Sequence, residues 1–291
     1  MNLLDTFWQS TLGTIDWTWK SMTLQVPANS NYFWGLILIS LAVWIGELVF
    51  PWRKNQAIFR QDFWMDGFYM FFNFFLFSIF ISGFYSVLES ILKMLGIEVT
   101  SLTVFSIQEL PEWGQLIIFF ILLDFVQWGT HILLHKIPAL WQFHKVHHSV
   151  KEMGFAAHLR YHWMENILYK PAKTIGVMVL GGFEPSQAFI VHFFAISIGH
   201  INHSNIKITW GFLKYVFNNP VMHLWHHAKA LPENKSTGVN FGISLSVWDY
   251  LFRTNYVPTA DGDTELGFKH DDNFPKKFKD QFLFGFTKSR K

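Results

Sequence analysis

The sequence predicts an all-α integral membrane protein whose histidine-rich helical part holds two metal ions. Three observations support this prediction. Of the 291 residues, 51% are hydrophobic and only 15% are charged, whereas average soluble domains carry about 25% charged residues. Long apolar segments recur along the chain, and most of its 14 histidines fall in a few short motifs. We expect about three spanning helices, a re-entrant helical hairpin and a cytoplasmic, His-rich helical cap with the dimetal site.

The composition also excludes several classes of protein. A net charge of +2 without a long basic run argues against binding to nucleic acid. The absence of cysteine excludes disulfides, Cys-ligated iron–sulfur clusters and thiolate zinc sites. No internal repeat or low-complexity tract divides the chain, so we expect one membrane domain over residues 1–291.

The apolar segments predict the membrane elements in order. Residues 1–31 are expected to contain an interfacial helix, because apolar side chains recur there at helical spacing; an ordinary surface helix is the alternative. Crossing a bilayer core requires roughly 20 apolar residues. Three segments are long enough to do so: residues 32–50, 68–88 and 113–135.

Loop charges predict the orientation of these spans. Segment 51–65 and the chain after residue 135 are rich in Lys and Arg, whereas segment 89–115 carries four Glu against one Lys. Because positive loops favour the cytoplasmic side, we expect the N-terminus outside and everything after residue 135 at the cytoplasmic face. The membrane would be the inner membrane of a bacterium or the endoplasmic reticulum of a eukaryote.

The apolar segment 172–199 is interrupted by Gly181, Gly182 and Pro185, and such residues break helices. Each half is too short to cross a bilayer alone at about 1.5 Å per residue. We therefore expect a hairpin that enters the membrane and returns. The alternative is one kinked span, which would place the histidines on its two sides at opposite membrane faces. The tail, 258–291, is basic and aromatic and is expected at the cytoplasmic membrane surface.

The histidines gather in four motifs. These are His131-x-x-x-His135, His144-x-x-His147-His148, His200-x-x-His203 and His223-x-x-His226-His227. Residues three and four apart share a helix face, so each motif can direct two or three imidazoles to one point. Imidazole binds iron, zinc, copper and nickel, and so many imidazoles exceed the needs of one four-coordinate ion. We therefore expect two ions. A ferritin-like site is excluded, because the sequence has no Glu-x-x-His motif.

These motifs resemble those of the fatty acid hydroxylase/sterol desaturase superfamily of membrane dimetal oxygenases. The resemblance covers residues 113–255, about half of the chain, and residues 140–149 are its most specific stretch. Trp163 replaces the proline of the family's Arg-x-His-Pro-x-Glu motif. The matching stretches are Asp124–His135, Leu140–Ser149, Arg160–Glu165, His203–Asn205, Pro220–His227, Asn240–Gly242 and Trp248–Thr254.

The resemblance implies a non-haem diiron centre that uses O2 to hydroxylate or desaturate a C–H bond of a membrane lipid. Electrons would come from a separate carrier of the cytochrome b5 or ferredoxin/reductase type. Zinc can replace iron at imidazole sites in purified protein. The implied metal ligands are His131, His135, His144, His147, His148, His203, His223, His226 and His227, with His200 or His162 as a tenth.

Four further residues are expected in the catalytic site, where they would orient imidazoles through the second ring nitrogen. They are Asp124, Glu165, Asn205 and Asp249; a helix cap or a turn residue is the alternative for each. An ether-lipid (alkylglycerol-type) monooxygenase has the same motifs and stays an alternative. A divalent metal transporter would instead distribute His along a path through the bilayer. A zinc hydrolase would need a Glu base beside its His pair, and His-Glu-x-x-His is absent.

Overall fold

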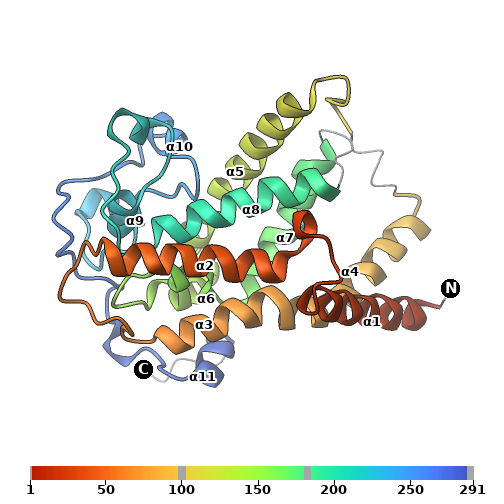
Figure 1. Ribbon diagram of the computed structural model, residues 1–291, viewed down its shortest axis with the longest axis horizontal. Helices are drawn as coiled ribbons and strands as arrows, with labels where there is room; N and C mark the ends of the chain where they lie inside the picture. The colour runs from red at the N-terminus through yellow and green to blue at the C-terminus, as the bar shows by residue number, and fades with distance from the viewer. Residues whose placement is uncertain (1, 98–102, 180–184, 287–291) are drawn as a thin grey trace. The chain divides into compact units, whose positions relative to one another are not determined.

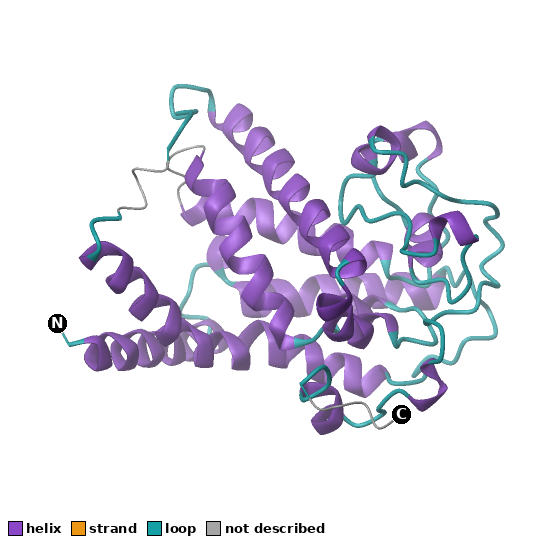
Figure 2. Cartoon of the chain, turned by 180° about the vertical axis from the view of Figure 1, so that it is seen from behind, coloured by secondary structure: helices purple, strands orange, loops and turns teal. Residues whose placement is uncertain are grey.

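The computed structural model describes residues 2–97, 103–179 and 185–286. Figures 1 and 2 show helices and loops throughout this part of the chain. Within it, β pairing is limited to isolated bridges, for example between Phe217 and Leu245. The all-α fold predicted from the sequence is therefore confirmed for the described residues.

In the described part of the chain, three helices are long and apolar enough to cross a membrane, and each of the predicted spans coincides with one of them. Side chains such as Leu38 and Ile45 on the first of these helices are more than half exposed. Water would penalise such apolar exposure, whereas lipid would not. The three helices are α2 (Tyr32–Val49), the helix Phe63–Met94, in which a π-helical turn (Phe72–Leu76) joins α3 (Phe63–Phe71) to α4 (Phe77–Met94), and α5 (Glu112–Lys136).

The chain divides into two compact units, each built from three separate segments. All histidines of the four sequence motifs belong to unit 2. Unit 1 comprises Met1–Leu38, Phe71–Leu123 and Lys173–Phe194, and unit 2 comprises Ile39–Met70, Asp124–Ala172 and Ala195–Lys291.

In unit 1, the N-terminal helix α1 (Leu3–Met22) packs against α4. Gly83 of α4 allows this approach, because a Cβ at that position would lie 2.5 Å from the Phe7 ring. A neighbouring face of α1 carries exposed Leu4, Trp8, Leu12, Ile15 and Trp19. Residues 1–31 thus contain a shorter helix than the predicted segment, and its placement at a membrane surface stays a prediction.

Two helices flank the predicted hairpin turn. α7 (Trp163–Val179) contains Pro171, and α8 (Pro185–Asn202) begins with a proline at a position where no backbone N–H is required. The turn residues Gly181 and Gly182 lie outside the described residues.

Unit 2 combines short helices with long ordered loops. Proline begins both α6 (Pro138–His148) and α9 (Pro220–His226), and the Asn219 side chain caps α9 by accepting from the Met222 N–H at 3.0 Å. Small apolar clusters support these helices, among them one that contains Met153, Ala157 and Leu224. The remaining elements are α10 (Val247–Leu251), α11 (Phe278–Phe282) and 3-10 helices at Phe155–Leu159, Gly211–Tyr215, Glu233–Lys235 and Asp271–Asn273.

The C-terminal tail packs on unit 2 through α11. The Tyr69 hydroxyl donates to the Gln281 side chain at 3.0 Å, and the His162 and Trp163 rings both donate to the Phe282 carbonyl at 2.8 Å. The Phe278 and Phe282 rings of the tail contact the Tyr69 and Trp163 rings, and contact of the tail with a membrane surface stays a prediction.

Candidate metal centre

Nine histidines of unit 2 form two groups that could each hold a metal ion. Within each group the candidate ligand nitrogens lie within 4.8 Å of one another. All nine imidazoles except that of His135 are buried. The first metal position comprises His131, His135, His144, His148 and His226, and the second comprises His147, His203, His223 and His227.

The two His-x-x-His-His motifs each serve both positions. On α6, His144 and His148 are four residues apart and project to the first position, while His147 projects to the second. The last motif mirrors this division, since it provides one imidazole to the first position and two to the second. Two imidazoles of each motif thus share one position, whereas the expectation that three of them meet at one point is corrected. Residues four apart share a face, whereas an intervening residue is turned towards a neighbouring face.

The two positions are adjacent. The His148 and His227 rings, one from each position, stack with centroids 4.4 Å apart. The His144 and His147 rings, again one from each, lie 5.2 Å apart. Two ions bound at these positions would therefore be close neighbours.

Hydrogen bonds decide which nitrogen of several imidazoles carries the proton. The Nδ1 atoms of His131 and His226 lie 2.8 Å from the carbonyls of Phe241 and Val239. A carbonyl only accepts, so Nδ1 is the donor and Nε2 carries the lone pair. The Nε2 of His226 is buried without a hydrogen-bond partner among the described residues. At the first position the His226 Nε2 is thus available to a cation, and the His131 Nε2 faces the Nε2 of His144, a further candidate ligand, at 3.1 Å.

The second position shows the same polarity. The Nδ1 atoms of His147 and His203 donate to the carbonyls of Arg160 and Gly199 at 3.0 and 2.8 Å. Their Nε2 atoms, both unprotonated, face each other at 3.4 Å. Facing lone pairs in a dry interior are unfavourable, and a cation between them would satisfy both, together with the His223 Nε2 that lies 2.8 Å from that of His203. The residues present therefore fit a metal ion at each position.

Burial keeps these imidazoles neutral. It lowers the pKa of His147 to about 3 and the pKa values of His223 and His227 well below the ordinary value. Protonating several close imidazoles would bring like charges together in a region of low dielectric. The site is thus prepared for metal cations rather than for protons.

Of the four further site residues predicted, Glu165 contacts a candidate ligand directly. Its Oε2 accepts from Nδ1 of His144 at 3.1 Å. Burial raises the pKa of Glu165 to about 8. A cation at the first position would attract the carboxylate and lower that pKa.

Asp124 and Asp249 hold the loop after residue 238 rather than an imidazole. Asp249 accepts from the N–H groups of Phe241 and Gly242 at 2.9 and 2.7 Å. Asp124 accepts from the N–H of Ser244 at 3.0 Å and from the N–H of Leu245 and the indole of Trp248. Both carboxylates are fully buried.

Asn205 ties the chain after His203 to the segment that follows α2. Its side chain accepts from the Arg53 N–H at 2.8 Å and donates to the Arg53 carbonyl at 3.2 Å. The structure brings it into unit 2 near the site without a hydrogen bond to a candidate ligand among the described residues. This contact matches the alternative that Asn205 is a turn residue.

The structure places neither candidate for a tenth ligand in the two groups. His200 hydrogen-bonds with Ser40 of α2 and with His158 at 3.1 and 2.9 Å. Although one helical turn separates His200 from His203, its ring meets these partners instead. His162 donates from Nε2 to Phe282 and accepts at Nδ1 from the Met164 N–H, so backbone groups occupy both of its nitrogens.

Sequence reasoning missed the backbone carbonyls that hold the imidazoles. Every residue type has a backbone carbonyl, so the sequence does not reveal which carbonyls bind imidazoles. The motif Asn240-Phe-Gly242 indicated only the region. Arg160 contributes its carbonyl to His147, and its guanidinium binds Asp62, Asp66 and Ser149. The two Asp residues had no recognisable motif.

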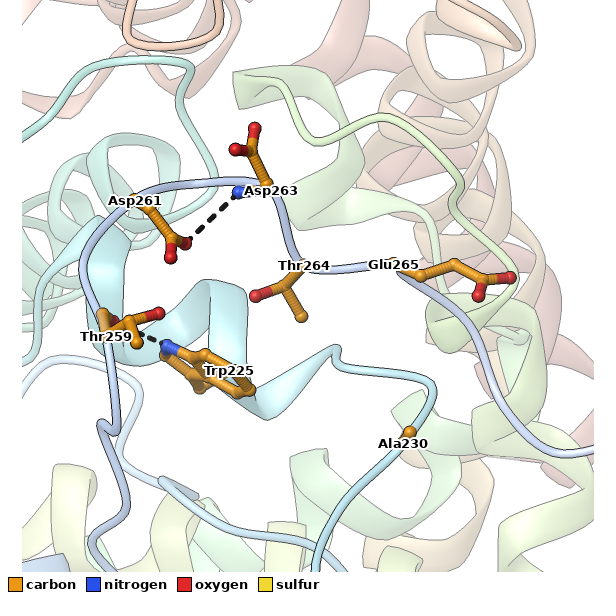
Figure 3. A pocket seen from close by; sticks show the side chains of 7 residues that line it. All are labelled: Trp225, Ala230, Thr259, Asp261, Asp263, Thr264 and Glu265. Carbon is orange, nitrogen blue, oxygen red and sulfur yellow. Dashed lines mark hydrogen bonds between the residues drawn. The ribbon is translucent and has the colours of Figure 1, made fainter.

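A cavity of about 300 Å³ lies on unit 2 beside α9. Trp225, which stands between candidate ligands in the sequence, lines it together with Asp261, Asp263 and Glu265 (Figure 3). The Trp225 indole donates to the Thr259 carbonyl at 2.8 Å. Trp225 therefore anchors the loop 259–265.

Fold and site together define a helical protein with membrane-length apolar helices and nine imidazoles at two adjacent metal positions. Residues 116–254, nearly half of the chain, match the sequence model of the fatty acid hydroxylase family. The histidine-rich part of the chain thus matches that family, and the resemblance drawn from the motifs is confirmed. No solved structure matches the chain significantly.

Curated relatives are lipid-modifying enzymes by name. The ornithine lipid hydroxylase of Rhizobium tropici is 30% identical over 157 residues, which cover 54% of this chain and 46% of that protein. The alkylglycerol monooxygenase of Caenorhabditis elegans is 27% identical over 52% of this chain and 28% of its own. The Danio rerio alkylglycerol monooxygenase is 25% identical over 87% of this chain and 51% of its own. The matches thus span about half or less of each relative.

Proposed function

We propose that this protein is a membrane-bound non-haem diiron oxygenase that oxidises a C–H bond of a lipid with O2 and electrons from a separate carrier. The observation that carries the proposal is the facing pair of unprotonated nitrogens on His147 and His203. The matching polarity of His131 and His226 supports a second ion beside the first. Imidazole ligands suit iron, and family membership favours iron over zinc.

Bound iron would supply the activation of O2 that an unactivated C–H bond requires. The chain's own part is to present neutral ligands and to exclude water. The imidazoles are buried, which keeps water away from them. They are also neutral ligands, and among the described residues the Glu165 carboxylate is the one charged group that hydrogen-bonds a candidate ligand. A reactive oxidant formed in such a site is protected from water.

Hydroxylation is favoured over desaturation. The relatives named above are a hydroxylase and monooxygenases, both of which add oxygen. An ether-lipid monooxygenase is the second candidate, since the match to the Danio rerio alkylglycerol monooxygenase extends over 87% of this chain. A metal transporter is disfavoured, because nine imidazoles gather at two adjacent positions instead of following a path through a membrane.

We further propose that the metal centre lies at the cytoplasmic face and that α7 and α8 form a re-entrant hairpin. His147 precedes the apolar segment 172–199 and His203 follows it, and the two meet at one metal position. A single span would separate them by the thickness of the bilayer. The distribution of Lys and Arg supports the cytoplasmic assignment.

The first test is the metal content of protein purified from iron-replete cells, combined with Mössbauer spectroscopy. We expect about two irons per chain, coupled to each other. A content below one iron or zinc per chain, unchanged in His147→Ala and His226→Ala, would refute the dimetal site. His270→Ala is the matched control, because His270 is exposed and outside both groups.

The second test is lipid analysis under labelled O2. Host lipids and an added alkylglycerol are incubated with the iron-loaded protein and a reductant system. Hydroxylation predicts incorporation of one labelled oxygen atom, and desaturation predicts loss of two hydrogens without label. If neither change occurs although two irons are bound, the proposed lipid oxidation is refuted while the metal site stands.

A further inference from the structure

One short backbone segment, residues 237–241, holds most of the imidazoles at the first metal position. The carbonyls of Val239 and Phe241 accept from His226 and His131, both at 2.8 Å. His135 hydrogen-bonds the backbone of Thr237. Three of the five imidazoles of this position therefore rest on alternate residues of one segment.

Gly238 and Asn240, which alternate with the three contact residues, have positive φ values. Gly238 and Asn240 have φ values of +119° and +51°, a region open to Gly and tolerated by Asn. The Asn240 side chain also clamps the segment by donating to the carbonyls of Met222 and Tyr256 at 2.8 and 2.7 Å. Its side-chain oxygen accepts from the Tyr256 N–H at 2.8 Å.

Asp249 anchors the C-terminal end of the segment. Its two oxygens accept from the consecutive N–H groups of Phe241 and Gly242. The Gly242 N–H and the Phe241 carbonyl belong to one planar peptide group, so this contact fixes the direction of that carbonyl. Thr254 and Trp128 donate to the same carboxylate at 2.5 and 3.3 Å. A fully buried carboxylate with four donors has a single orientation, and hydrogen bonds to charged groups are the strong ones.

The second metal position uses different supports. His147 donates to the Arg160 carbonyl, and the Arg160 guanidinium is held by Asp62, Asp66 and Ser149 at 2.9–3.0 Å. His203 donates to Gly199 within its own helix. Among the described residues, no hydrogen bond joins segment 237–241 to an imidazole of the second position.

We propose that segment 237–241, anchored by Asp249, positions His131, His135 and His226 of the first metal position, and that Arg160 positions His147 of the second. Each ion can then be lost without the other. Asp249 and Arg160 are positioning residues, since they act on the ligands through backbone carbonyls. The inference rests on the proposed function only in that both positions bind iron.

Iron content per chain tests this division. In Asp249→Asn an amide NH2 replaces one carboxylate oxygen, so a donor faces a backbone N–H and the segment is released. We expect the content to fall from about two irons to about one, with loss of the coupled Mössbauer signal. Asp263→Asn, an exposed Asp on the 259–265 loop, is the matched control and should keep two.

Double variants identify which ion has gone. Adding His226→Ala to Asp249→Asn should leave about one iron, whereas adding His227→Ala should leave almost none. Arg160→Gln should show the reverse pattern with the same two ligand variants. A further loss on adding His226→Ala, or two irons in Asp249→Asn, would overturn the proposal.

A milder variant covers the case that Asp249→Asn does not fold. Asn240→Gly keeps the positive φ but removes the clamp to Met222 and Tyr256. A chelator should then extract one of the two irons more readily than from the parent protein, because loss of a ligand's support lowers metal affinity about 10–100-fold. Parent-like release of both irons would contradict the role of the segment. Absence of iron from the parent protein would instead refute the proposed function.

Discussion

The Nε2 atoms of His147 and His203 face each other at 3.4 Å, and neither can carry a proton. The Nδ1 atom of each ring already donates to a backbone carbonyl, that of Arg160 or that of Gly199. A neutral imidazole has one N–H only. The pair is therefore repulsive by itself and becomes favourable when a cation lies between the rings.

Removal of the metal should accordingly destabilise the fold. An ion present at about 100 times its Kd contributes about 2.7 kcal/mol to the free energy of unfolding. We expect a chelator to lower Tm by several degrees, as followed by tryptophan fluorescence in detergent, and iron readdition to restore it. His270→Ala should show the same shift as the parent protein. An unchanged Tm in chelator would contradict metal binding to the folded state.

Substitution of Glu165 should weaken iron binding at the first position. Glu165→Gln keeps the size of the side chain but removes the charge that accepts from His144. Loss of such a partner costs about 10–100-fold in metal affinity. Competition with a chromophoric chelator measures this change. Glu109→Gln, at an exposed site, is the control; equal affinities in the two variants would show that the carboxylate is not needed.

Acid should release the C-terminal tail through His162. Burial lowers the pKa of His162 to about 4, while an unfolded His has a pKa of about 6.5. The folded chain then binds fewer protons than the unfolded chain, so docking weakens as pH falls below about 6.5 and is lost below about 4. Protonated Nδ1 would also face the Met164 N–H.

Limited proteolysis of the tail between pH 7 and pH 4 measures this release. Cleavage near Phe282 should increase as the pH falls. His162→Phe should be cleaved more readily than the parent protein at pH 7 already, because one of the two hydrogen bonds to the Phe282 carbonyl is gone. If cleavage of the parent protein does not vary with pH, His162 does not control the tail.

Contact between α1 and α4 should be sensitive to one methyl group. In Gly83→Ala the new Cβ would lie 2.5 Å from the Phe7 ring and 2.6 Å from the Thr11 hydroxyl. Overpacking of this kind costs about 1–3 kcal/mol. Gly13→Ala on α1 is the matched control, because a Cβ there meets nothing within 4 Å and should add about 0.5–1 kcal/mol. Thermal unfolding compares the two, and equal Tm values would argue against the packing.

Local spacing explains why much of the site was predictable. The nine imidazoles at the two positions are all among the ten histidines of the four motifs, because a helix brings His residues three and four apart close together. The apolar runs likewise predicted the three membrane-length helices, because length and hydropathy are properties of single segments. Whether these imidazoles bind iron stays a proposal.

The sequence by itself determined the helical class, the membrane-length helices and the histidines that meet. The tertiary structure alone decided that His147 lies in the second metal position with His203, while its motif partner His144 lies in the first. It also decided that His200 hydrogen-bonds His158 and that His162 hydrogen-bonds the Phe282 carbonyl. It also decided that carbonyls of residues 237–241 orient the first position. The physical reason is that helical periodicity acts over a few residues, whereas carbonyl contacts depend on loops distant in the chain, and every residue type has a carbonyl.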